Sequence, residues 1–399
     1  MAYDCDVCVV GGGPAGMMLA VLLLRAGLRV TVLEKHADFL RDFRGDTIHA
    51  STLNLMDELG WGEEFLRLPH QKARRLSGTF GDREYTFGDC GRLPGRHRYI
   101  ALMPQWDFLD FLAGKASEHA GFTLLRSTEV DGLLRSGGGS AGRVVGVTAA
   151  GPDGPVEVRA RLVVACDGRR SDVRRLLGLR PREYGAPMDV LWFRLPRQPS
   201  DPDGVSFIVG AGLGLVLIDR GEYFQVAYII PKGGFEAVQA GGLEALVDNV
   251  GKLAPSLAGR GDVLKTWDDV SKLTVVINRL HRWDHSGVLL IGDAAHAMSP
   301  MGGVGVNLAI QDAVAAARLL SSGLDAPLWR VQLRRWYPTV ATQLLQRALG
   351  RGVVARVLRS DRPLPVPRFV RLADRFPVLQ GLPARAVAIG FLPEHIAST

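Results

Sequence analysis

The residues from Ser286 to Asp312 combine an acid, a cluster of glycines and a helix start in an order that suits ligand binding. Val288 to Ile291 is a short apolar run that predicts a buried strand, and Asp293 follows where that strand stops. Gly302, Gly303 and Gly305 then precede an apolar-periodic segment that predicts a helix. Such a turn can bring bare backbone N–H groups against a ligand, and the helix start behind it favours negative charge. The stretch predicts a site for an anionic group at the carboxyl edge of a sheet.

A second glycine cluster lies near the start of the chain and predicts a dinucleotide site. Gly11, Gly13 and Gly16 fit the pattern G-x-G-x-x-G between an apolar strand and an apolar helix. Pro14 suits the first helical position and leaves the N–H groups of Ala15 and Gly16 free for a diphosphate. A second strand, Leu28 to Leu33, ends at Glu34, where a ribose-binding acid is expected. The motif does not decide between NAD and FAD.

Two further segments carry charges that suit the same ligand. The buried strand expected at Arg161 to Ala165 is followed by Asp167 and Gly168, again an acid at a strand end. Arg41 and Arg44 lie in a loop before the next helix, and an arginine fork can hold two diphosphate oxygens. Ordinary surface charge is the alternative for these two arginines.

The 399 residues exceed what a single core usually supports, so two domains, or one domain with a large insertion, are expected. Residues 180–275 alternate apolar and polar positions, which predicts a mixed or antiparallel sheet interrupted by one helix, residues 242–253. The sequence therefore predicts an α/β fold: a Rossmann-type domain, an inserted mixed β-sheet substrate domain and a C-terminal helical tail. The expected boundaries are 1–70, 101–178 and 276–335 for the first domain, 71–100 and 179–275 for the second, and 336–399 for the tail.

Charge is unevenly distributed. The net charge is +7. From Arg330 onward the sequence has 12 arginines and only three acidic residues, Asp361, Asp374 and Glu394. Solvated helical faces are the simplest interpretation, while a surface for an acidic carrier or a membrane stays open. Nucleic acid is not expected, because the basic residues are not interleaved with stacking aromatics.

Cysteine usage favours a reducing, cytoplasmic protein. Cys5 and Cys8 form a C-x-x-C, but they fall in an expected strand, where residues three apart point to opposite faces and cannot chelate one metal. No metal site is expected. No apolar run approaches 18 residues and no signal peptide pattern is present, so no integral membrane association is expected.

Together, the Gly11 to Gly16 motif with Glu34, the Asp167-Gly168 segment, and Gly292-Asp293 leading to Pro300 and the 302–307 loop resemble the p-hydroxybenzoate hydroxylase-like, single-component FAD monooxygenases. The resemblance covers most of residues 1–335 and implies a Rossmann-type FAD-binding domain. By this similarity Asp293 binds the ribityl chain and Glu34 the adenosine ribose. The implied FAD-binding residues are Gly11, Gly13, Ala15, Gly16, Glu34, Lys35, Arg44, Gln105, Val130, Asp167, Asp293, Gly303, Gly305, Val306 and Asn307.

The resemblance also implies a reaction. NADPH or NADH reduces FAD, O2 adds to give a flavin C4a-hydroperoxide, and an aromatic or polyketide-like small molecule is hydroxylated. Pro300 and Asn307 are expected to shape the flavin and substrate environment, and no catalytic base is assigned. His296 is interpreted as structural. Substrate-facing candidates, each with strand core as the alternative, are His49, Trp192, Phe193, Arg194, Tyr223 and Tyr228.

Two other functions stay open: an FAD-dependent dehydrogenase or reductase that inserts no oxygen, and a flavin-bound protein that docks a carrier through its arginine-rich end. A halogenase is disfavoured because the W-x-W-x-I-P signature is missing. After Gln332 the chain departs from longer members, with no room for a thioredoxin-like domain. A last amphipathic piece, residues 369–396, is expected to pack on the FAD domain, with a membrane-surface or homodimer contact as the alternative.

Overall fold

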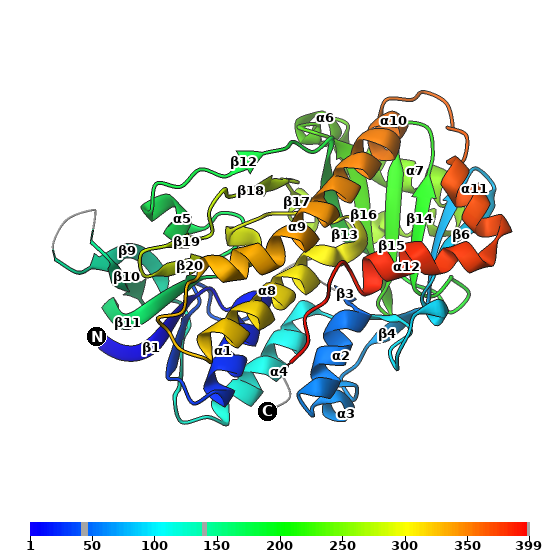
Figure 1. Cartoon of the computed structure of the whole chain (residues 1–399). Helices are drawn as coiled ribbons and strands as arrows, with labels where there is room; N and C mark the ends of the chain where they lie inside the picture. The colour runs from blue at the N-terminus through cyan, green and yellow to red at the C-terminus, as the bar shows by residue number, and fades with distance from the viewer. Residues whose placement is uncertain (41–46, 138–141, 397–399) are drawn as a thin grey trace.

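Two large β-sheets, each built from strands far apart in sequence, organise the protein in this computed structural model, which describes residues 1–40, 47–137 and 142–396 (Figure 1). Helices join and cover them. This is the expected α/β class, which is therefore confirmed. The expected domain boundaries stay a prediction.

The first sheet has a parallel centre, with β20, β11, β1, β2 and β8 as successive neighbours. Its strands are β1 (Ala2–Val10), β2 (Val30–Leu33), β8 (Phe122–Leu125), β9 (Glu129–Arg135), β10 (Val144–Gly151), β11 (Gly154–Ala165), β19 (Asp284–His285) and β20 (Val288–Leu290). Their apolar runs are buried because helices cover the sheet. Among these helices, α1 (Pro14–Arg25) packs against both α8 (Val304–Leu320) and α4 (Gln105–Ser117), and the three lie side by side in Figure 1.

The second sheet is antiparallel apart from one parallel pair, β14 with β5. In sheet order its strands are β17 (Ser271–Leu273), β13 (Met188–Pro196), β16 (Tyr223–Pro231), β15 (Gly214–Asp219), β14 (Val205–Val209), β5 (Arg75–Phe80) and β6 (Arg83–Asp89). Side chains alternate across it, as the period of two requires. Leu191, Phe193 and Leu195 enter one core, while Val190 and Trp192 point to the opposite face.

The remaining elements are short strands and helices. The strands are β3 (Thr47–Ile48), β4 (Gln71–Ala73), β7 (Ile100–Leu102), β12 (Arg182–Glu183) and β18 (Asn278–Arg279). The helices are α2 (Ala50–Glu58), α3 (Gly62–Phe65), α5 (Asp172–Leu176), α6 (Phe235–Ala240), α7 (Gly242–Leu253), α9 (Trp329–Leu349), α10 (Ala355–Leu358), α11 (Arg368–Arg375) and α12 (Gly381–Ala388). The segment Met301–Leu320 is long and apolar enough to span a membrane by length and composition alone, but 67% of it is buried inside the protein, as in a core helix.

Two expectations about helices are wrong. Residues 180–275 contain α6 as well as α7, because α6 ends at Ala240 and the chain turns at Gly242, which has a φ of 83°, before α7 continues. The single amphipathic piece expected from residue 369 to 396 is broken after α11, since Pro377 has no N–H and restricts Phe376 before it.

The C-terminal helices also lie elsewhere than expected. α11 and α12 pack against β6 of the second sheet, and Figure 1 shows both beside it. α12 also contacts the segment after β3, because the carbonyl of Val387 accepts from the ring of His49, and the last described residues pack beside the helices of the first sheet. There Glu394 pairs with Arg334 and Arg335, and His395 pairs with Glu58 of α2.

Candidate active site

The first glycine turn is shaped by close backbone contacts. Gly11 has a φ of 102°, and a Cβ there would lie 2.6 Å from the carbonyl oxygen of Cys166. A Cβ on Gly16 would lie 2.0 Å from the carbonyl oxygen of Gly11. Gly13, the residue before α1, has open space around it. Gly11 therefore lets the turn approach the end of β11, and Gly16 lets α1 begin close to Gly11. Gly13 leaves room for a ligand at the N-terminus of α1.

Glu34 lies at the tip of β2 and is only 7% exposed. Its Oε2 accepts a hydrogen bond from the N–H of Gly12 at 2.9 Å, and its Oε1 accepts one from the N–H of His36 at 3.1 Å. The carboxylate is thus held beside the glycine turn. Lys35 next to it pairs with Glu129 at 3.7 Å, with both side chains largely exposed.

Asp293 is held by two arginines that sequence reasoning did not single out. Arg169 Nη2 lies 3.4 Å from Asp293 Oδ2, and Arg174 Nη1 donates to the carbonyls of Asp293 and Ala294 at 3.5 and 2.9 Å. Both arginines lie in or just before α5, which follows Asp167. The run of charged residues at 169–175 was visible in the sequence, but no local pattern predicts that Arg169 pairs with Asp293, 124 residues away.

Asp167 itself begins the turn into α5. Its Oδ2 accepts from the N–H of Val173 at 3.1 Å, and burial raises the pKa of this carboxyl. Among the described residues, Asp167 Oδ1 and Arg169 Nη1 are buried with no hydrogen-bond partner. Unpaired buried polar atoms are rare, so their position beside the glycine turn fits a site that a polar ligand completes.

A cavity of about 1460 Å³ connects these groups. It is lined by most of the residues expected at the cofactor: Gly11, Gly13, Ala15, Glu34, Lys35, Gln105, Val130, Asp167, Asp293, Pro300, Gly303, Gly305 and Val306. Gly16 and Asn307 are not part of the lining, and Arg44 and Arg41 lie outside the described residues. Contact with a cofactor stays a prediction for all of these residues, inside and outside the lining.

Asn307 uses its side chain to hold the loop rather than to face the cavity. Its Oδ1 accepts from the N–H of His49 and the hydroxyl of Thr52, at 2.9 and 2.8 Å. Its Nδ2 donates to the carbonyls of Thr47 and Gly303, at 3.0 and 3.2 Å. Three of these bonds join the start of α8 to the segment from Thr47 to Thr52, and the fourth reaches back to Gly303, the residue before α8.

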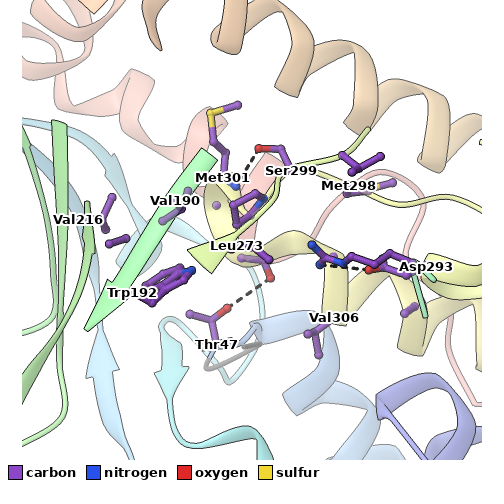
Figure 2. A pocket seen from close by; sticks show the side chains of 18 of the residues that line it. Thr47, Val190, Trp192, Val216, Leu273, Asp293, Met298, Ser299, Met301 and Val306 are labelled. Carbon is purple, nitrogen blue, oxygen red and sulfur yellow. Dashed lines mark hydrogen bonds and ion pairs between the residues drawn. The ribbon is translucent and has the colours of Figure 1, made fainter. Parts of the chain in front are cut away.

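The far end of the cavity is apolar. It is floored by the open face of the second sheet, including Val190, Trp192, Val216 and Ala227. Figure 2 shows the loop from Met298 to Met301 between Asp293 on one side and Val190, Trp192 and Val216 on the other. The opposite wall comes from the C-terminal segment, which sequence reasoning did not place there: Leu345, Leu349, Val354, Leu358, Phe369, Leu382 and Val387.

The other residues predicted to face the substrate lie in different parts of the structure. Phe193 and Tyr228 belong to the core on the far side of the second sheet. His49 is buried, and its Nδ1–H donates to the carbonyl of Val387 in α12 at 2.8 Å. Arg194 is exposed and lies over the ring of Tyr223, which does not line the cavity.

His296 has the structural surroundings expected for it. Its Nε2–H donates to Asp312 Oδ2 at 2.6 Å, and its ring lies 4.7 Å from that of Trp283. Neither His296 nor His49 belongs to the described lining of the cavity. Among the described residues, the lining at the apolar end therefore contains no histidine that could act as a base.

Comparison with known proteins places this geometry in a family. A family model described as "FAD binding domain" matches residues 4–327. The chain is 38% identical to 6-methylpretetramide 4-monooxygenase of Streptomyces rimosus, over 80% of this chain and 76% of that protein. It is 30% identical to a 12-dehydrotetracycline 5-monooxygenase/anhydrotetracycline 6-monooxygenase of the same species, over 98% and 74%. The solved structure of OxyS anhydrotetracycline hydroxylase from Streptomyces rimosus superposes with a TM-score of 0.73 at 27% identity, covering 97% of this chain and 76% of that one.

Proposed function

This chain belongs to the p-hydroxybenzoate hydroxylase-like family of FAD-dependent monooxygenases, and we propose that it uses NAD(P)H and O2 to hydroxylate a polycyclic aromatic or polyketide-like small molecule. One observation carries the choice of substrate class. A single cavity runs from the Gly11 turn and Glu34 to the apolar face of the second sheet. Its volume of about 1460 Å³ exceeds the roughly 300–1,000 Å³ of a site for one drug-sized ligand, which leaves room for FAD and a substrate together.

The described residues fit FAD, and we assign them roles on that basis. The N–H groups of Ala15 and Gly16, at the start of α1, would hold the diphosphate, and Glu34 would hold the adenosine ribose. Asp293 would hold the ribityl chain, oriented by Arg169. The first N–H groups of α8 have no helical acceptors and would stabilise negative charge on the ring system. The chemistry that bound FAD supplies is hydride acceptance from NAD(P)H and activation of O2.

The apolar end is suited to an uncharged ring system. Val190, Trp192, Val216 and Ala227 offer a broad apolar floor, and their burial with a substrate would exclude water from the reaction. Two polar side chains nearby hydrogen-bond to the loop itself: Thr47 donates to the carbonyl of Gly303 at 3.3 Å, and the Ser299 hydroxyl accepts from the N–H of Met301 at 3.4 Å. An apolar lining of this kind would select its ligand by shape. The named relatives are monooxygenases of 6-methylpretetramide and of 12-dehydrotetracycline and anhydrotetracycline, which supports a substrate of this class.

The test is oxygen labelling of the FAD-loaded protein. NADPH oxidation is measured with fused-ring phenols, quinones and aromatic polyketides, with anhydrotetracycline as the first probe, under 18O2. We expect substrate-triggered NADPH oxidation and a product that carries one 18O atom. Substrate conversion without label would instead establish a dehydrogenase or reductase on the same fold. Turnover that requires an added carrier protein would favour the docking function.

Location and assembly are proposals too. All four cysteines are free, which supports a reducing, cytoplasmic location. We propose small-molecule partners, no integral membrane association and no nucleic acid, and a homodimer as the assembly to test by light scattering.

A further inference from the structure

The side-chain amide of Gln346, in α9, holds the loop that carries Pro300. Gln346 is 4% exposed. Its Oε1 accepts from the N–H of Ser299 at 3.1 Å, and its Nε2 donates to the carbonyls of Ser299 and Met301 at 2.9 and 3.1 Å. These bonds lie on both sides of Pro300 in the sequence.

The loop needs such a partner. Residues 297–299 belong to no helix or strand, and Pro300 has no N–H to donate. A buried backbone group left unpaired is destabilising, so an irregular buried loop must take its partners from side chains. Glutamine carries both an acceptor and two donors, and can replace a missing neighbouring strand.

The same turn of α9 also touches the substrate end. Leu345 and Leu349, on either side of Gln346, line the cavity. A Cβ built on Gly350 would lie 3.8 Å from Met301 Cε, so the end of the helix passes close over the loop. One helical turn therefore contacts both the apolar wall and the backbone beside Pro300.

A second glutamine of α9 makes a similar clamp away from the cavity. Gln332 Oε1 accepts from the N–H of Trp283 at 3.0 Å, and its Nε2 donates to the carbonyl of His281 at 2.7 Å. None of these three residues lines the cavity. Gln332 is thus a control of the same residue type, in the same helix and with the same kind of hydrogen bonds, but it is half-buried and does not contact the loop.

We propose that Gln346 is a positioning residue that fixes the main chain of Pro300 between the cofactor end and the substrate end of the cavity. The inference rests on the proposed function in so far as Pro300 lies beside the reacting groups. It places a determinant of the reaction geometry in a helix beyond residue 327, where the FAD-binding domain match ends.

The experiment compares FAD-loaded Gln346→Leu and Gln332→Leu with the unchanged protein. Melting temperature reports the loss of the clamp as such, and both variants should melt lower. The visible absorption spectrum of the bound flavin, without substrate, reports the loop beside the ring. The fraction of NADPH oxidation that yields hydroxylated product reports the substrate geometry. Only Gln346→Leu should shift the flavin spectrum and lower that fraction, by on the order of 10-fold or more, because a displacement near 1 Å can cost about 100-fold.

An unchanged flavin spectrum in Gln346→Leu, or an equal change in Gln332→Leu, would overturn the proposal. If Gln346→Leu does not fold, Gln346→Glu takes its place. Protonated glutamic acid keeps an acceptor and one donor, so its flavin spectrum should return toward that of the unchanged protein as the pH is lowered; no recovery would also overturn the proposal. The spectrum needs no substrate, so failure of the inference is distinct from failure of the unchanged protein to give labelled product.

Discussion

Replacing Asp312 by asparagine should destabilise the protein through the most deeply buried charges of the first domain. The Asp312 side chain is 0% exposed; its Oδ2 accepts from the N–H of Gly292 at 3.1 Å and from His296 at 2.6 Å, and its Oδ1 accepts from Arg335 Nε at 2.9 Å. Burial alone would raise the pKa of Asp312, but the charges of His296 and Arg335 and their hydrogen bonds outweigh it and hold the pKa below its ordinary value. In asparagine, one of the two oxygen positions becomes an NH2 group, which cannot accept from these donors.

The size of the effect follows from the burial. Removing one partner of a buried ion pair costs about 3–5 kcal/mol, because the remaining charge stays uncompensated. An unfolding entropy of about 2.1 cal/mol/K per residue gives about 0.8 kcal/mol/K for 399 residues. The melting temperature of Asp312→Asn should therefore fall by about 4–6 °C, as measured by calorimetry with FAD bound. FAD should also dissociate more readily, since Gly292 precedes the Asp293 site.

Asp325→Asn is the control. Asp325 also pairs with an arginine, Arg161 at 3.4 Å, but its side chain is 91% exposed. Exposed pairs contribute about 0–1 kcal/mol, so this variant should melt within about 1 °C of the unchanged protein. Equal melting temperatures for Asp312→Asn and Asp325→Asn would refute the reasoning.

Three further predictions follow from burial and from the C-terminal contacts. Burial lowers the pKa of His49 from 6.5 to about 4, so as the pH falls the unfolded chain takes up the proton first. The His49 contribution to the free energy of unfolding is complete above pH 6.5 and should fall by about 3 kcal/mol as the pH approaches 4. Urea titrations should show this pH dependence in the unchanged protein and not in His49→Gln. Deleting residues 365–399 should lower the melting temperature and the FAD content, since it removes buried Glu394 from its bonds with Arg334 and Arg335; full retention of both would contradict this packing. Cys5, Cys8 and Cys90 are buried free thiols whose pKa burial raises, so a disulfide reagent at pH 8 should modify these three only after unfolding, and fast reaction of any of them in the native protein would count against it.

The sequence was informative where local pattern determines structure. The strand, glycine turn and helix around Gly11 to Gly16 could be predicted because each residue type has a local reason, and Gly11 and Gly16 are indeed at positions where a Cβ would clash. Asp293 could be placed after its strand for the same reason. Periodicity likewise predicted strands within residues 180–275 and located α7, because these elements are long enough to show a period of two or 3.6 residues.

Contacts between distant segments left no such trace. Residues 71–100 were expected to belong with the second sheet, but no local pattern predicted the pairing of β5 with β14, more than a hundred residues later. The ion pair of Arg169 with Asp293 has the same long range. The position of α11 and α12 over β6 depends on bonds such as that from the N–H of Thr86 to Asp374, which amphipathicity alone cannot specify. Pro377, by contrast, was a visible helix breaker within the segment expected to be continuous.

Four buried polar side chains of α8 and α9 suggest a signal that could have located the site loop. Taken in order along the loop, Asp312 accepts from the N–H of Gly292, Gln343 donates to the carbonyl of Ala297, Gln346 holds Ser299 and Met301, and Asn307 donates to the carbonyl of Gly303. A loop that brings bare backbone against a ligand cannot pair its remaining polar groups within itself, so neighbouring helices must supply the partners. In a helical pattern these residues look like polar interruptions of a buried face. Their physical meaning is that an irregular backbone passes there, and in this protein that backbone lines the cavity along with Asp293 and the apolar face of the second sheet.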